Sequence, residues 1–249
     1  MSGEWINKGA YLLDLGDFEK AAECFDKAID KATIEEPLDA HAWYQRGIAY
    51  RKLGNYEEAI QSFDKSVELE PANADAWRTR GAVQNDLGRY AEALESSEKS
   101  IAIDPTAARA WIVRGFALHN LSRYEDAVAS YARAIELNPL GAEGRRAWNN
   151  RGASLDNLRR HEEAIDSYEE ALMIDPFDAY AWNNKGVALS ALGRHEEAIK
   201  CFDKAILIQP EYTTAWKNKV VALQAQGRDT EAKEVMGLAR KLRPSVGQF

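Results

Sequence analysis

The sequence predicts an all-α fold, a tandem array of antiparallel helix pairs, from three observations. Tryptophan recurs along the 249 residues, and four of the six spacings are 34 residues: Trp5, Trp43, Trp77, Trp111, Trp148, Trp182 and Trp216. Glycine stands four residues after every tryptophan but the last, where Val220 replaces it, and alanine stands sixteen residues after all seven. Proline closes most units. A fixed period near 34 indicates a helix-turn-helix repeat that stacks on its neighbours.

Seven repeats follow one another, and we expect them to form a single array over residues 1–249. Their expected ranges are 2–35, 40–73, 74–107, 108–141, 145–178, 179–212 and 213–246. Each begins with a first helix that carries the tryptophan and glycine. Five of these helices are followed by a glycine suited to a left-handed cap, namely Gly16, Gly54, Gly88, Gly193 and Gly227.

The second helix of each repeat opens with acidic residues, as in Glu57 and Glu58, which complement the helix dipole. It ends near proline, which lacks the N–H needed to continue a helix. Twenty residues after the tryptophan a bulky side chain recurs, with Ser97 as the small exception: Phe25, Phe63, Tyr131, Tyr168, Phe202 and Met236. We expect these side chains to fill the space that the small glycine and alanine residues leave.

Two longer spacings, of 38 and 37 residues, mark insertions around Lys31 to Glu36 and Leu140 to Gly144. The extra residues must lengthen a second helix or bulge between repeats. Because Gly141 and Gly144 favour irregular backbone, we expect a bulge at the second insertion.

These columns resemble the tetratricopeptide repeat family over nearly the whole chain. The resemblance implies a right-handed superhelical solenoid of fourteen helices whose first helices line a concave groove. It places in that groove, facing solvent, a set of candidate peptide-binding residues: Asn150, Asn184, Asn218, Asn149, Asn183, Arg146, Lys217, Tyr180, Arg109, Arg78 and Tyr44. Basic side chains outnumber acidic ones at the expected groove positions, which favours an acidic or neutral ligand.

Asparagine at one groove position in three consecutive repeats is the most specific of these signals. An amide offers both donor and acceptor, so Asn150, Asn184 and Asn218 suit the main chain of an extended peptide. The column resembles the asparagine ladder of the O-linked N-acetylglucosamine transferases. The alternative is that the Asn-Asn pairs are a by-product of repeat duplication, and the sequence leaves both interpretations open.

Catalytic and metal motifs are absent from the sequence, which predicts no enzyme, no cofactor and no metal site. His161 and His195 each precede Glu-Glu-Ala-Ile, but neither has the second histidine of a zinc motif. Cys24 and Cys201 lie five repeats apart, which makes a disulfide between them implausible. The net charge of −8 argues against nucleic acid and anionic membrane, and no long apolar run is present. We expect a soluble cytoplasmic protein.

Function is therefore expected to come from a surface, as a non-catalytic scaffold that binds a peptide or protein segment in the groove. Two alternatives stay open: a structural protein that self-assembles through its array ends, and an accessory subunit that recruits partners to an enzyme. The pattern of the chaperone-binding carboxylate clamp fits no window of the chain. For self-association, the last repeat offers an apolar stripe, Val220, Val221, Leu223, Val235, Met236 and Leu238.

Overall fold

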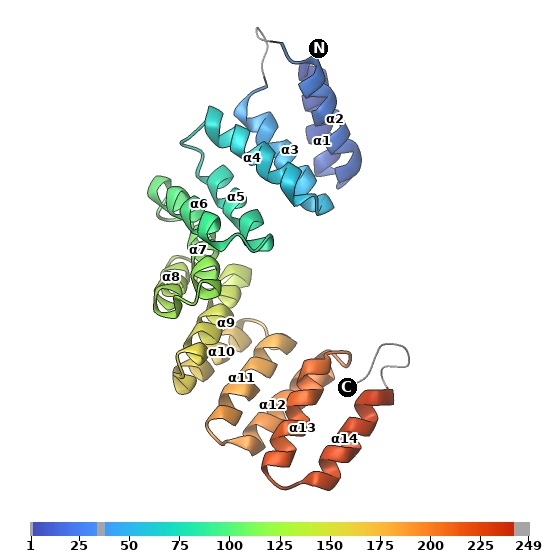
Figure 1. Cartoon of the computed structure of the whole chain (residues 1–249), viewed down its shortest axis with the longest axis vertical. Coiled ribbons are helices and arrows are strands. Elements are labelled where there is room, and N and C mark those ends of the chain that lie inside the picture. Colours follow the sequence, from blue (N-terminus) through green and yellow to red (C-terminus); the bar gives the residue numbers. More distant parts are fainter. Residues whose placement is uncertain (1, 34–37, 242–249) are drawn as a thin grey trace. The chain divides into compact units, whose positions relative to one another are not determined.

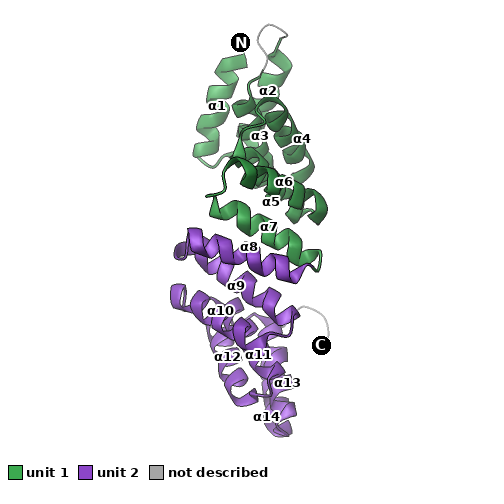
Figure 2. Ribbon diagram, turned by 90° about the vertical axis from the view of Figure 1, so that its left-hand side faces the viewer, with its two compact units in different colours: residues 1–122 green, residues 123–249 purple. Residues whose placement is uncertain are grey.

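The structure is a computed structural model that describes residues 2–33 and 38–241. These residues form fourteen α-helices and no strand. The chain divides into two compact units, residues 1–122 and 123–249, and the division falls between the two helices of the fourth repeat (Figure 2). Each unit is described by itself below.

Both units are successions of antiparallel helix pairs (Figure 1). Unit 1 contains α1 (Ser2–Asp14), α2 (Phe18–Lys31), α3 (Ala40–Leu53), α4 (Tyr56–Leu69), α5 (Ala74–Asp86), α6 (Tyr90–Ile103) and α7 (Ala108–Asn120). Unit 2 contains α8 (Tyr124–Leu137), α9 (Gly141–Asn157), α10 (His161–Ile174), α11 (Ala179–Ala191), α12 (His195–Ile208), α13 (Thr213–Ala225) and α14 (Asp229–Lys241). These boundaries confirm the predicted helix pairs.

The core of each repeat is the predicted combination of small and bulky columns. All seven column alanines, from Ala21 to Ala232, are at most 1% exposed, and so are the five aromatic side chains of the bulky column. The glycines give those rings their space: a Cβ added at Gly47 would lie 2.6 Å from Cε1 of Phe63. The first and second helices approach closely because the small glycine and alanine residues leave room for the bulky side chains that face them.

Left-handed backbone ends the first helices, as expected. All five predicted cap glycines have φ between 72° and 80°. The fourth and fifth repeats reach the same conformation without glycine, at Ser122 (φ 60°) and Arg159 (φ 59°). Strain therefore falls on these two caps, since a Cβ disfavours the left-handed region.

A hydrogen bond from tryptophan joins consecutive repeats at the regular junctions. The indole Nε1 of Trp77, Trp111, Trp182 and Trp216 donates to the carbonyl of the proline six residues before it, over 2.8–3.0 Å. The tryptophan of one repeat therefore binds the loop that closes the preceding repeat.

The second insertion corrects the sequence prediction. α8 ends at Leu137, and residues 141–144 form the first turn of α9, which has 17 residues where the other helices have 13 or 14. The insertion thus lengthens the next first helix instead of bulging or extending the second helix. Gly141 makes the turn at φ 76°, and Gly144 admits the carbonyl oxygen of Pro139, which would lie 2.3 Å from an added Cβ. At the first insertion, residues 34–37 lie outside the described residues.

First helices form one side of each unit. Within unit 2, α11 contacts both α9 and α13, and within unit 1 α3 contacts α1 and α5 contacts α7. Within each unit, a second helix packs mainly against the neighbouring first helices, as α10 does against α9 and α11. Each first helix has one face directed away from the second helices, and in neighbouring repeats these faces lie next to one another. We call this the inner side of the unit, and it holds the candidate site.

Candidate functional site

Four asparagine side chains of unit 2 form a hydrogen-bonded chain across three repeats. Nδ2 of Asn218 donates to Oδ1 of Asn183 (2.9 Å), Nδ2 of Asn183 donates to Oδ1 of Asn184 (3.4 Å), and Nδ2 of Asn184 donates to Oδ1 of Asn149 (3.5 Å). The chain therefore links α13, α11 and α9. We call these four residues the amide chain.

Burial in the amide chain is greater than the sequence led us to expect. Asn183 is only 3% exposed, and the other three are half-buried rather than facing solvent freely. An asparagine amide offers two N–H donors and two acceptor positions. Each half-buried member uses one or two of these on its neighbours, so part of its hydrogen-bonding capacity is left for a ligand.

Asn150 has a different partner from the other two members of its column. It is half-buried, and its side chain lies close enough to the hydroxyl of Tyr131 on α8 to affect the pKa of that tyrosine. Burial raises the pKa of Tyr131 well above its usual range, since the ring is 1% exposed. Asn150 therefore ties α9 to the preceding repeat, which matches the structural interpretation of the column better than the ligand-binding one.

Apolar and cationic side chains border the amide chain. Val187 lies one helical turn after Asn184 on α11, and Val221 lies one turn after Asn218 on α13; they are 42% and 63% exposed. Arg146 and Lys217 are exposed on the same helices as the asparagines. The sequence analysis did not single out Val187 for the site, although it falls in a groove column.

Tyr180 lies at the N-terminal end of α11 and remains 55% exposed. Its ring pairs with Tyr212, with centroids 4.9 Å apart at an interplanar angle of 57°. The tilted pair gives this end of the site a fixed aromatic surface. Tyr180 is thus available to a ligand without needing to be ordered first.

The candidate residues of unit 1 are more occupied by neighbouring side chains. Nε and Nη2 of Arg78 both donate to Oδ1 of Asp75, and the Arg78 side chain is 16% exposed. Tyr44 packs against Phe63, and its hydroxyl lies 3.5 Å from Oγ1 of Thr79, which is 1% exposed. Arg109 is exposed on α7.

A half-buried carboxylate with a perturbed pKa lies on α9, the helix that carries Asn149. Asp156 at the C-terminal end of α9 binds Nδ1 of His161 through Oδ1 (2.9 Å) and accepts from the hydroxyl of Tyr168 through Oδ2 (3.1 Å). Burial raises the pKa of Asp156 despite these two partners. The described residues contain no group of three His, Cys, Asp or Glu side chains able to hold a metal ion. None of their helices is long and apolar enough to cross a membrane.

The outer face carries a column of cations that the sequence analysis missed. Three residues after the tryptophan, an Arg or Lys stacks over its ring in six repeats, with 5.4–6.0 Å to the centroid. Four of these cations, together with Lys219 at the same position of the seventh repeat, pair with an acid on the preceding second helix: Arg46 with Asp26, Arg80 with Asp64, Arg114 with Glu98, Lys185 with Glu169 and Lys219 with Asp203. The signal in the sequence was the second charged column, an acid 21 residues after five of the seven tryptophans.

The apolar stripe of the last repeat is smaller than expected from the sequence. Leu223 and Val235 are buried in the core of unit 2, at 1% and 7% exposure. Val221 and Leu238 are 63% and 52% exposed. The surface offered for self-association therefore rests mainly on these two side chains.

Comparison with known families agrees with the repeat architecture. Two family models described as tetratricopeptide repeat match the chain, one at residues 6–73 and 44–108, the other at 108–139, 146–178 and 179–212. An uncharacterised protein of Methanocaldococcus jannaschii is 42% identical over 55 residues. That match spans 22% of this chain and 59% of the relative.

Solved structures show the same fold. YrrB, described as a TPR protein with an unusual peptide-binding site, superposes with a TM-score of 0.62 at 29% identity, covering 80% of this chain and 98% of YrrB. MamA gives 0.61 at 27% identity, covering 69% and 92%. A tetratricopeptide repeat protein of Parabacteroides merdae gives 0.76 over 97% of this chain and 93% of its own, at 18% identity.

Proposed function

We propose a binding function for this chain, which belongs to the tetratricopeptide repeat family. It is a non-catalytic scaffold, and its first helices in unit 2 bind an extended segment of a partner protein. The observation that carries the proposal is the amide chain from Asn218 to Asn149. It sets amide groups of three successive repeats in line. The regular spacing of the repeats matches a ligand that is itself regular, namely a polypeptide main chain.

The surroundings of the amide chain favour the same kind of ligand. Val187 and Val221 give exposed apolar contacts for side chains of the segment, and Tyr180 gives an aromatic one. Arg146 and Lys217 favour acidic side chains, and that preference weakens with salt. YrrB, at 29% identity, is described as having a peptide-binding site, which supports a binding role for this architecture.

The energy available from the amide chain is moderate. Each hydrogen bond to a ligand main chain contributes about 0.5–1.5 kcal/mol net, because water is displaced from both partners. Three such bonds change affinity by roughly one to three decades, since 1.4 kcal/mol is tenfold. Apolar contact at the two valines adds to this and sets which segment is preferred.

The experiment uses exposed residues, because changing the asparagines also disturbs contacts between repeats. A partner is isolated by affinity capture with the full chain, and its binding is measured by calorimetry against the Val221→Glu and Val187→Glu variants. Both should weaken binding at least tenfold while leaving helicity intact. The matched control is Leu207→Glu, at a side chain that is 75% exposed on α12, outside the site. Equal binding by all three variants would place the binding surface elsewhere.

Self-assembly through the last repeat is the second candidate function, favoured by the exposed pair Val221 and Leu238. Light scattering separates it from the scaffold. A self-assembling protein has a mass that grows with concentration without any partner, and Leu238→Glu abolishes that growth. A scaffold has one mass at all concentrations, and Leu238→Glu leaves its partner binding unchanged.

A further inference from the structure

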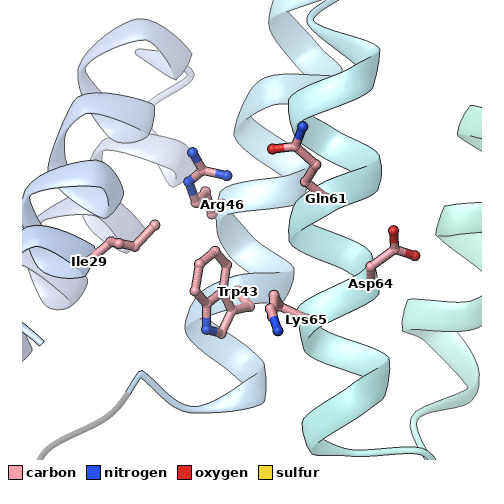
Figure 3. Close-up of a pocket in the computed structure, with 6 residues that line it drawn as sticks. All are labelled: Ile29, Trp43, Arg46, Gln61, Asp64 and Lys65. Carbon is pink, nitrogen blue, oxygen red and sulfur yellow. The ribbon is translucent and has the colours of Figure 1, made fainter. Parts of the chain in front are cut away.

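We propose a second binding site, on the outer face of the first two repeats, that takes a bulky apolar side chain from an acidic segment of a partner protein. The site is a pocket of about 480 Å³ between α2, α3 and α4 (Figure 3). It is lined by Ile29, Trp43, Arg46, Gln61, Asp64 and Lys65. None of these residues is among the candidate groove residues predicted from the sequence.

An apolar side chain suits the middle of this pocket. Ile29 points from α2 toward the half-buried indole of Trp43 on α3, and both side chains line the pocket (Figure 3). A neighbouring hollow of about 250 Å³ shares Ile29, Trp43 and Lys65 with it and adds Leu38 and Leu69. The volumes lie within or just below the range of ordinary ligand sites, so a leucine or phenylalanine side chain fits.

Arg46 supplies a fixed cation at one end of the pocket. Nε donates to Oδ1 of Asp26 (2.9 Å), Nη2 lies 2.8 Å from the same oxygen, and Nη1 donates to Oγ of Ser62 (2.6 Å). The guanidinium also lies over the rings of Trp43 and Tyr50, 5.7 and 4.6 Å from their centroids. These contacts use three of the five N–H donors of the guanidinium, whose side chain is 14% exposed. Asp64, which also lines the pocket, is paired with Arg80.

Lysines strengthen the preference for an acidic ligand. Lys65 stands at the opposite side of the pocket with its side chain 53% exposed, and its ammonium is 2.7 Å from Glu68. Around Trp5, which packs against the same small core as Trp43, three ammonium groups gather: Lys8, Lys27 and Lys31 lie 5.4, 5.1 and 5.1 Å from the ring centroid.

Glu23 lies 3.8 Å from the ammonium of Lys27 and offsets one of these charges, and acidic side chains of a bound segment offset the repulsion between the others. The concentration of cations is local, because the whole chain carries a net charge of −8. A long polyanion such as nucleic acid is repelled by the remaining surface. A short acidic segment with one apolar anchor meets both features of the site, so it is the ligand we infer.

The test uses the full chain and a blocked five-residue peptide with phenylalanine between two Asp-Glu pairs. Binding is followed by the NMR shifts of the tryptophan indole N–H groups, assigned by substitution. We expect saturable shifts at Trp43, and affinity that falls with salt. Replacing the phenylalanine with alanine, or the acids with lysine, should each weaken binding at least tenfold. A lysine peptide that binds equally well, or an absence of saturation at millimolar peptide, overturns the proposal.

Variants place the peptide on this site. Gln61→Glu adds a negative charge at an exposed lining residue and should weaken the acidic peptide at least fivefold. Ala129→Glu, the same position of the fourth repeat, is the matched control and should leave binding unchanged. Equal loss in both variants, or a short single-stranded oligonucleotide that shifts Trp43 more strongly than the peptide, overturns the assignment. Val221→Glu should leave peptide binding at this pocket unchanged. A failure of the pocket proposal can therefore be distinguished from a failure of the groove proposal, which predicts that Val221→Glu weakens binding of the partner.

Discussion

Arg159 and Ser122 occupy the same left-handed backbone position in consecutive repeats, with φ of 59° and 60°, where five other repeats have glycine. A side chain in this conformation costs about 1–2 kcal/mol. Glycine removes that cost but adds roughly 0.5–1 kcal/mol of conformational entropy to the unfolded chain.

Arg159→Gly should therefore raise the free energy of unfolding by about 0.5–1 kcal/mol. The side chain is exposed, so little packing is lost. Urea denaturation checks this, with Gly193→Arg at the same position of the next repeat as the reverse change, which should destabilise by a similar amount. A destabilised Arg159→Gly would show that the arginine side chain compensates for the strain.

Glycines in the helix contact should differ according to the side chain that faces them. Gly47→Ala places a Cβ 2.6 Å from the ring of Phe63, which is fully buried, and should destabilise by about 1–3 kcal/mol. At Gly81 the nearest atoms are 3.2 Å away, because Ser97 replaces the aromatic side chain in that repeat. Gly81→Ala should cost at least about 1 kcal/mol less. Thermal unfolding of the two variants gives the comparison, and equal costs would contradict it.

Ala132 interrupts the outer column of acids, and a carboxylate there should stabilise unit 2. Arg151 stacks over Trp148 and donates to Oγ of Ser167, while burial lowers its pKa. At the five other junctions the residue in this column is an acid paired with the cation. Ala132→Glu should add about 0.3–1 kcal/mol, less at high salt. Ala132→Gln is the matched neutral control, and an equal gain from it would exclude the ion pair as the cause.

Asp156 should make stability depend on pH in an unusual direction. Its pKa in the folded protein is raised above 3.8, mainly by burial, so the folded state holds the proton more tightly than the unfolded state. Ionisation of Asp156 therefore lowers the free energy of unfolding as pH rises through the raised pKa. Asp156→Asn should gain stability over the natural chain between about pH 4 and about pH 7, as measured by urea midpoints. Asp166→Asn, at an exposed carboxylate of α10, should show a much smaller change.

Hydrogen bonds between the asparagines also predict a stability effect. We expect a double-mutant cycle of Asn183→Ala and Asn218→Ala to give a coupling energy of about 0.5–1.5 kcal/mol, since the two amides bond at 2.9 Å. Asn150→Ala with Asn218→Ala is the control cycle and should show none. A coupling near zero for the first pair would mean that the amide chain contributes nothing to the contact between repeats.

Periodicity made the helices and the small and bulky columns predictable, because each depends on spacing within one repeat. Residues such as Asn183 and Asn184 were found as site candidates for the same reason. Their bonds to each other were not predictable, since those depend on side-chain conformations in two neighbouring repeats. The path of the insertion near Gly144 was also missed: a glycine that favours irregular backbone equally permits a carbonyl to pack against a helical turn.

The hydrogen bond from the indole to the proline carbonyl favours changes in chain length by whole repeats. Removal of residues 179–212 would put Trp216 six residues after Pro176, the separation that Trp182 has now. The shortened chain would thus regain the lost junction from residues already present, whereas a deletion that is not a whole number of repeats would change this six-residue separation. Duplication and loss of whole modules are therefore nearly neutral for the fold, and sequences of this kind can vary in repeat number faster than in repeat length.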